Sequence, residues 1–249
     1  MRCPRCQGDQ TDGLAECPQC GVVFARYRPR PVPAEAGAAM ATERVSWRVL
    51  AWQGWDWLRR AMFEQEPAES RLATLCRGLF LLALALWGLS FLCKPLEGEE
   101  IMSSFMHLIN LPFHEAGHVV FSPFGRFIQV LGGTLGQLLV PMIVAGSFLA
   151  KRNPFGAAVG GWWLGQSLLD CAPYVNDARA GELMLIGGVT GKDVADYHDW
   201  EVMLGRLGWI DYDHIIARIF WSLGALVMIA SLAWGATLLW RQWRSRADA

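Results

Sequence analysis

Residues 111–121 read Leu-Pro-Phe-His-Glu-Ala-Gly-His-Val-Val-Phe, which places a His-Glu-x-x-His pattern inside an otherwise apolar segment. On a helix, His114 and His118 project from the same face, so both imidazoles can bind one metal ion. Glu115 lies beside them and can take a proton from a metal-bound water. Ionisable groups are costly to keep in hydrocarbon, and their presence there usually indicates a function. The stretch therefore predicts a zinc-binding helix in a membrane domain.

The composition agrees with a membrane protein that carries a small additional module. The chain has 249 residues, of which 53% are hydrophobic and 13 are Trp, and its mean hydropathy is +0.24. The net charge of −1 gives no reason to expect a nucleic-acid partner. The N-terminus is polar and rich in cysteine, with no apolar signal segment. We expect an all-α polytopic membrane protein with four to five transmembrane helices and a small N-terminal zinc ribbon.

The predicted zinc ribbon occupies residues 1–27, where two C-x-x-C pairs are separated by ten residues. Each pair can bind one side of a tetrahedral zinc, and Gly21 permits the turn after the second pair. Two disulfides are the alternative, but the chain lacks secretory features, so a reducing compartment is favoured. Four thiolates leave no open coordination position, which indicates a structural zinc and a module that can dock a protein partner. The four cysteines are Cys3, Cys6, Cys17 and Cys20.

The chain after the ribbon divides into a linker, an interfacial segment and a membrane domain. Residues 28–45 are rich in Pro and Ala and predict an extended linker. Residues 46–70 interleave Trp with Arg, which is typical of an amphipathic segment in the headgroup layer; a helix packed on the membrane domain is the alternative. Residues 71–249 form the predicted transmembrane metalloprotease-like domain. Its candidate spans are residues 72–93, 101–124, 127–150, 155–173 and 215–240.

The charge pattern leaves one question of topology open. Arg71 and Arg77 flank the start of the first span, and the acidic loop 97–100 follows it. We therefore expect a protein of the bacterial inner membrane with its N-terminus on the cytoplasmic side. The apolar length of residues 127–150 favours a crossing, whereas the placement of the basic clusters favours re-entry. Within it, the Gly-rich stretch 132–137 indicates either close helix approach or buried non-helical backbone.

A catalytic zinc needs a third protein ligand and an open position for water. Asp170, at the C-terminal end of an apolar span, is the favoured candidate. Asp177 is the alternative, seven residues on, although Pro173 argues against a helix that continues to it. His198 and Glu182 in the polar loop are further options. The competing interpretation is a pair of hydrogen-bonded buried histidines and a solvated loop.

Residues 72–240 resemble the membrane domain of the site-2 protease family of intramembrane zinc metalloproteases. The family's first motif, on one membrane helix, is matched by His114, Glu115 and His118. Its second motif, an Asp on a later helix, is matched in part by Leu169-Asp170. The resemblance implies a zinc endopeptidase that cleaves an unwound membrane segment, with a catalytic zinc in addition to the structural one.

This sequence departs from the family pattern at the second motif. Cys171 stands where the family has Gly, and the usual preceding Asn-Pro is missing. The stretch 132–137 is similar to the irregular segment that follows the catalytic helix, and no peptide-binding domain is inserted. A catalytically inactive membrane scaffold that binds partners through its ribbon is therefore the alternative function. A membrane protease of the gluzincin type, with Glu182 as third ligand, is a further alternative.

Overall fold

The computed structural model describes residues 1–28, 47–64 and 70–247, which fall into two units, Met1–Ala51 and Trp52–Ala249. The linker predicted over residues 28–45 lies, apart from its first residue, outside the described part of the chain. The two units are described separately below, the ribbon first.

The N-terminal unit consists of two turns that repeat the same backbone pattern. In the first turn the Cys3 amide donates to the Gly8 carbonyl over 3.0 Å, and in the second the Cys17 amide donates to the Val22 carbonyl over 2.9 Å. Each turn closes through a residue in the left-handed region, with φ of 56° at Gln7 and 68° at the equivalent Gly21. A short 3-10 helix, η1 (Phe24–Arg26), follows. The repeat brings both cysteine pairs to one point.

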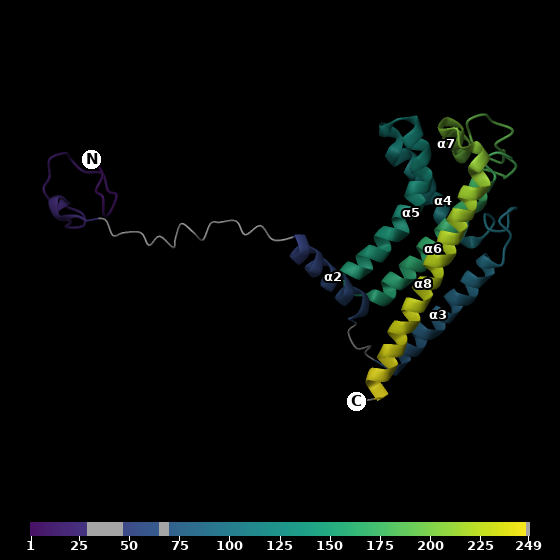
Figure 1. The fold of residues 1–249 in the computed structure, drawn as a ribbon, viewed down its shortest axis with the longest axis horizontal. Coiled ribbons are helices and arrows are strands. Elements are labelled where there is room, and N and C mark those ends of the chain that lie inside the picture. Colours follow the sequence, from purple (N-terminus) through teal and green to yellow (C-terminus); the bar gives the residue numbers. More distant parts are fainter. Residues whose placement is uncertain (29–46, 65–69, 248–249) are drawn as a thin grey trace. The chain divides into compact units, whose positions relative to one another are not determined.

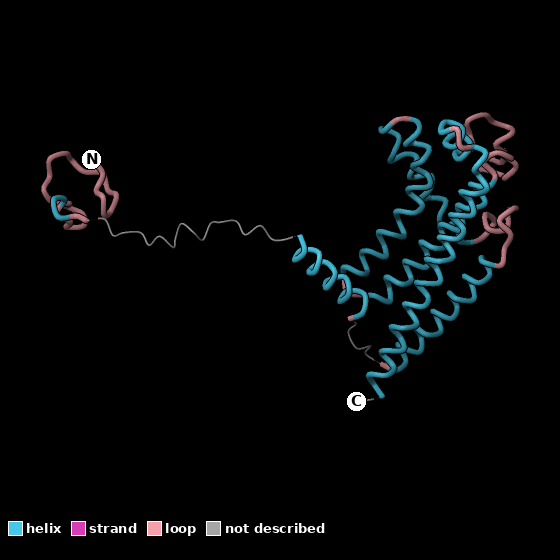
Figure 2. The backbone as a smooth tube through the Cα atoms, viewed as in Figure 1, coloured by secondary structure: helices cyan, strands magenta, loops and turns pink. Residues whose placement is uncertain are grey.

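The regular secondary structure in the described residues of the second unit is all helical, and loops join the helices, as Figures 1 and 2 show. Three of its helices are long and apolar enough to cross a membrane, namely Arg71–Leu92, Arg126–Ala150 and Ile210–Ser245. The elements in chain order are α2 (Trp47–Phe63), α3 (Arg71–Leu92), α4 (Phe105–Phe121), η2 (Ser122–Phe124), α5 (Arg126–Ala150), α6 (Pro154–Asn176), α7 (Asp199–Leu207), η3 (Ile210–Tyr212) and α8 (Asp213–Ala247).

Helix α6 is the central element of this unit. Most of its side chains are buried, and it packs along α8 on one side and α5 on another. The contact with α8 depends on Gly165 and Gly224, because a Cβ atom on Gly224 would lie 2.7 Å from the Gly165 carbonyl oxygen. Small residues at a helix crossing let two backbones approach closely. The glycines therefore set the position of α6 in the bundle.

Helices α4 and α5 form an antiparallel hairpin joined by η2. A Cβ atom on Gly117 of α4 would overlap the Gly132 carbonyl oxygen of α5, and one on Gly136 would overlap the Phe113 carbonyl oxygen. The stretch 132–137 is thus regular helix at a close contact, which is the first of the two alternatives that the sequence left open, and the likeness to an irregular segment does not hold. At about 1.5 Å per residue, the unbroken α5 is roughly 37 Å long, the length of a crossing.

The sequence-based boundary at Pro173 is also wrong, because α6 continues through this residue to Asn176. Pro173 lies in the last turn of the helix. Its missing amide removes one hydrogen bond there, and the helix ends three residues later. Asp170 and Asp177 therefore stand on one continuous helix and its C-cap.

The last turn of helix α2 packs on the bundle, which is one of the two interpretations that the sequence left open; a position in the headgroup layer stays a prediction. Trp52, Trp55 and Trp57 are exposed, as expected for an interfacial helix. Its last turn packs on α8, where the Trp234 indole donates to the Met62 carbonyl over 3.0 Å. The same end of α2 is therefore fixed to the bundle while the Trp side chains face outward.

Candidate metal centre

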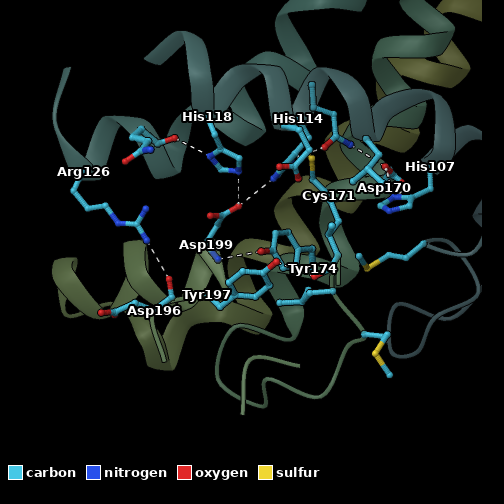
Figure 3. Close-up of a pocket in the computed structure, with 18 residues that line it drawn as sticks. His107, His114, His118, Arg126, Asp170, Cys171, Tyr174, Asp196, Tyr197 and Asp199 are labelled. Carbon is cyan, nitrogen blue, oxygen red and sulfur yellow. Dashed lines mark hydrogen bonds and ion pairs between the residues drawn. The ribbon is translucent and has the colours of Figure 1, made fainter. Parts of the chain in front are cut away.

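A cavity of about 270 Å³ opens beside the His-Glu-x-x-His helix (Figure 3). Helices α4, α5 and α6 form its walls, and the loop between α6 and α7 covers it. His114, Glu115 and His118 line it, and these three residues each offer an atom within 4.8 Å of the others. The predicted motif therefore faces an accessible space within the helical bundle.

The two histidines are held in the tautomer that a metal requires. Nδ1 of His114 lies 3.1 Å from Oε1 of Gln137, and Nδ1 of His118 lies 2.9 Å from the carbonyl oxygen of Gln129. Both partners are acceptors, so each Nδ1 carries the proton and donates. Each Nε2 is then left with a free lone pair, as in most metal-binding histidines.

A carboxylate from a distant part of the chain meets both imidazoles. Oδ2 of Asp199 lies 3.0 Å from Nε2 of His114 and 3.2 Å from Nε2 of His118 (Figure 3). Two lone pairs and an ionised carboxylate repel one another unless a cation lies between them.

Asp199 is positioned by the start of α7. The His198 ring caps this helix, since its Nδ1 accepts the Glu201 amide over 3.2 Å. The Asp199 amide donates to the Tyr174 hydroxyl of α6 over 3.0 Å, and the Tyr174 and His198 rings are in contact, with their centroids 4.3 Å apart and their planes tilted by 40°. The cap and these contacts fix the direction in which the Asp199 side chain leaves the helix.

The donor set fits a zinc ion. Zinc held at about 2.0–2.1 Å by nitrogen and oxygen ligands in a tetrahedron separates those ligands by roughly 3.3 Å. The two distances from Asp199 to the histidines, 3.0 and 3.2 Å, are close to this value. Gly133 on α5 leaves the space open, because a Cβ atom there would lie 2.5 Å from Nε2 of both histidines. Two histidines and one carboxylate also leave a fourth position for water.

Asp170, the predicted third ligand, is connected to His114 through the side chain of Gln137. It is 2% exposed and accepts from the side-chain amides of Gln137 over 2.8 Å and Asn110 over 3.1 Å. It also contacts Nδ1 of His107 at 3.1 Å. Because Asp170 binds the amide nitrogen of Gln137, the oxygen of Gln137 is turned to His114. The carboxylate that contacts both histidines is therefore that of Asp199. Asp170 instead orients Gln137, which contacts His114.

Asp177, the alternative third ligand, organises the loop over the cavity. Its carboxylate accepts the amides of Glu182 and Leu183, each over 2.9 Å. His198 Nε2 lies 3.5 Å from the same carboxylate, so His198 joins the loop to α7. Glu182 pairs with Lys192 on the outside of the loop. None of these three side chains contacts His114 or His118 among the interactions of the described residues.

The ribbon has a second set of metal-binding side chains. Sγ of Cys3 and Cys20 are 3.7 Å apart, as are those of Cys6 and Cys17. A tetrahedral zinc with four sulfur ligands at about 2.3 Å separates them by roughly 3.8 Å. All four cysteines are free thiols, so the disulfide alternative does not occur. The expected four-cysteine metal site is thus present in geometry.

The sequence analysis did not select Asp199 as a candidate ligand, nor Gln137 as the hydrogen-bond partner of His114. Asp199 follows a polar loop with several other carboxylates, and only its place at the N-terminus of α7 separates it from them. Gln137 is a buried amide in an apolar helix, which is a signal for a functional partner, although the partner itself is set by the α4–α5 contact. Comparisons with protein-family models, curated proteins and solved structures give no match to this chain.

Proposed function

We propose that the chain is a zinc-dependent membrane peptidase. The observation that carries the proposal is the placement of the Asp199 carboxylate 3.0 and 3.2 Å from the two histidine Nε2 atoms. The orientation of both Nδ1 atoms toward carbonyl oxygens supports a metal between these three groups. In this proposal His114, His118 and Asp199 hold the zinc. A bound zinc supplies a Lewis acid for the scissile carbonyl and lowers the pKa of a water to near neutrality.

Glu115 is proposed as the general base. It follows His114 directly, lines the same cavity and offers its carboxylate within 4.8 Å of the histidine nitrogens. It takes a proton from the attacking water and then gives it to the leaving amine, which is the usual exchange for such a residue. Neither role can be filled by Asp199, which is held between the two imidazoles.

The proposed substrate is a peptide segment of a membrane protein. Three helices of the same unit are candidate spans, and the cavity is lined by the motif helix and by one of these spans, α5. The cavity has apolar walls at Leu111, Leu185 and Ile186 beside its polar floor. Such a lining accepts an extended chain with apolar side chains, because a helical peptide bond is shielded by its own hydrogen bonds. We therefore propose an enzyme similar to the site-2 proteases. Its third zinc ligand would be Asp199, which lies after the second motif at Leu169-Asp170.

The proposed topology has four crossings, made by α3, α5, α6 and α8. The guanidinium of Arg77 lies over Phe155 at the start of α6, and that of Arg152 lies 3.4 Å from Glu64 after α2. Arg241 lies over Phe63 at the end of the same helix. The basic residues therefore gather at one end of the bundle, and on the positive-inside rule we propose that this end and the N-terminus are cytoplasmic.

The proposal is tested in native membranes with Glu115→Gln and the wild-type chain. Newly formed N-termini of membrane proteins are compared by mass spectrometry, and zinc is counted in the purified proteins. We expect Glu115→Gln to keep about two zinc ions per chain and to lose the cleavage products that the wild type forms. Identical N-termini in both strains would assign the chain to the scaffold alternative, since the general base is then without a role.

A further inference from the structure

A second cavity, larger than the first, lies along the N-terminal half of α6, whereas the first lies near the C-terminal end of that helix. It has a volume of about 510 Å³ and is bounded by α3, α4, α5 and α6. Helices α3 and α5 both pack on α6 but do not pack along each other, so the cavity is a groove that opens between them. Its walls are almost wholly apolar, and they include Leu84, Val144, Phe148, Val159 and Trp162.

One charged residue, Arg77, lines this groove. It is half-buried and stands six residues after the start of α3, about 9 Å along the helix axis. Its guanidinium lies 5.8 Å from the centroid of the Phe155 ring. Among the described residues, no carboxylate lies within the 4.0 Å of an ion pair with Arg77.

A cation at this depth of a membrane span needs an anion that reaches it from the headgroup layer. An arginine side chain can turn toward the interface, where phospholipid phosphates lie, and its fork of N–H groups matches a phosphate in two places. Lys151 is exposed beside Asn153, which also lines the groove, and it adds positive charge at the same end. The walls of the groove are thus apolar along most of their length and positively charged at one end.

We propose that this groove binds an anionic phospholipid, with one acyl chain along α6 and the phosphate on Arg77. A headgroup of net negative charge is preferred, because the ammonium of a zwitterionic headgroup would face both Arg77 and Lys151. A free phosphate would leave the apolar trough open to hydrocarbon, so the lipid is the ligand that uses both parts of the site. This site goes beyond the proposed peptidase activity and does not depend on it.

The test uses the full chain in bilayer discs made of equal parts anionic and zwitterionic phospholipid. After extraction into detergent, retained lipid is identified by native mass spectrometry for the wild type, Arg77→Gln and Arg71→Gln. Arg71 is the matched control, since it is the first residue of the same helix and does not line the groove. We expect one anionic phospholipid per wild-type chain. Retention should fall roughly fivefold in Arg77→Gln, the factor for about 1 kcal/mol per basic side chain at an anionic surface, and stay unchanged in Arg71→Gln.

Two further measurements guard against a variant that fails to fold. Val159→Phe keeps Arg77 but narrows the trough, and we expect the same loss of retained lipid. Anionic lipid should raise the Tm of the wild type and of Arg71→Gln, but not that of Arg77→Gln, while all three have equal Tm in zwitterionic discs. Equal retention by the wild type and Arg77→Gln, retention of both lipid classes alike, or a copurifying peptide in place of lipid would each overturn the proposal.

Discussion

The two candidate metal sites are built in opposite ways. The ribbon takes its four sulfur ligands from a segment of 18 residues, Cys3 to Cys20, and two copies of one turn place them. In the second unit, the carboxylate that meets both histidines belongs to Asp199, 85 positions beyond His114, and tertiary contacts place it there. The first set closes the coordination sphere, whereas the second leaves one position open. The local sequence is therefore enough to specify the four-cysteine site. The arrangement of the second site, with its free coordination position, depends instead on contacts between several helices.

The largest expected effect is the independent loss of each metal. Cys17→Ser should reduce zinc from about two ions per chain to one and leave the membrane site loaded, because the two units share no ligand. His114→Ala should also leave one zinc, at the ribbon. Metal analysis of the purified full chain, with the double variant as the control for zero, measures both. One zinc in the wild type that His114→Ala does not change would remove the membrane site.

Space at the membrane site gives the next effect. Gly133→Ala should abolish zinc binding there, because its Cβ atom would stand 2.5 Å from both Nε2 atoms. Gly146→Ala on the same helix is the matched control, since nothing lies within 4 Å of a Cβ atom at that position. Zinc analysis of the two variants, with circular dichroism to show equal helix content, makes the comparison. A fully loaded Gly133→Ala protein would mean that the metal lies elsewhere.

The two carboxylates near the histidines should differ in the size of their effects. Asp199→Ala removes a ligand and should empty the membrane site at micromolar zinc. Asp170→Asn keeps the ligands but loosens Gln137, and we expect affinity to fall by about 10- to 100-fold, as for other residues behind metal ligands. Competition with a chelator of known affinity gives both values. The reverse order of effects would return Asp170 to the position of third ligand.

The smallest effect concerns the loop that leads to Asp199. Burial would raise the pKa of Asp177, but its contact with His198 and its two backbone hydrogen bonds lower the pKa below 3.8. A carboxyl group whose pKa is lowered on folding stabilises the folded loop at pH values above its unfolded-state pKa. This stabilisation is lost as the pH falls through the folded-state pKa. The protection factors for hydrogen exchange of residues 178–197, which are corrected for the intrinsic pH dependence of exchange, should therefore fall below about pH 4.

The matched variants for this pH effect are Asp177→Asn and Glu182→Gln. Asp177→Asn should show fast exchange at neutral pH already, with little further change in acid, because it cannot accept both amides as a carboxylate does. Glu182 pairs with Lys192 on the surface, so its variant should follow the wild type. Equal exchange in all three proteins would leave Asp177 without this role.

The sequence was sufficient for features that depend on local spacing. It located the cysteine turns and the motif helix, and it placed the long apolar helices to within a few residues, because these depend on neighbours along the chain. It misjudged Pro173 because tertiary packing keeps a helix intact past a proline in its last turn. It could not select Asp199 over Asp170, since Asp170 is the lone carboxylate of an apolar segment, whereas Asp199 is one of several carboxylates near a polar loop. The contact between α6 and α7 brings Asp199 to the histidines.

The position of Asp199 after the covering loop links two events that would otherwise be separate. Tyr197 donates to the Ile186 carbonyl, and Arg126 donates to the Asp196 carbonyl, so the residues just before Asp199 hold the loop over the cavity. A metal bound as proposed would stabilise the position of Asp199 and, through these contacts, the loop over the cavity. Metal binding and the closed position of the loop would then be coupled, and each would favour the other by the same factor.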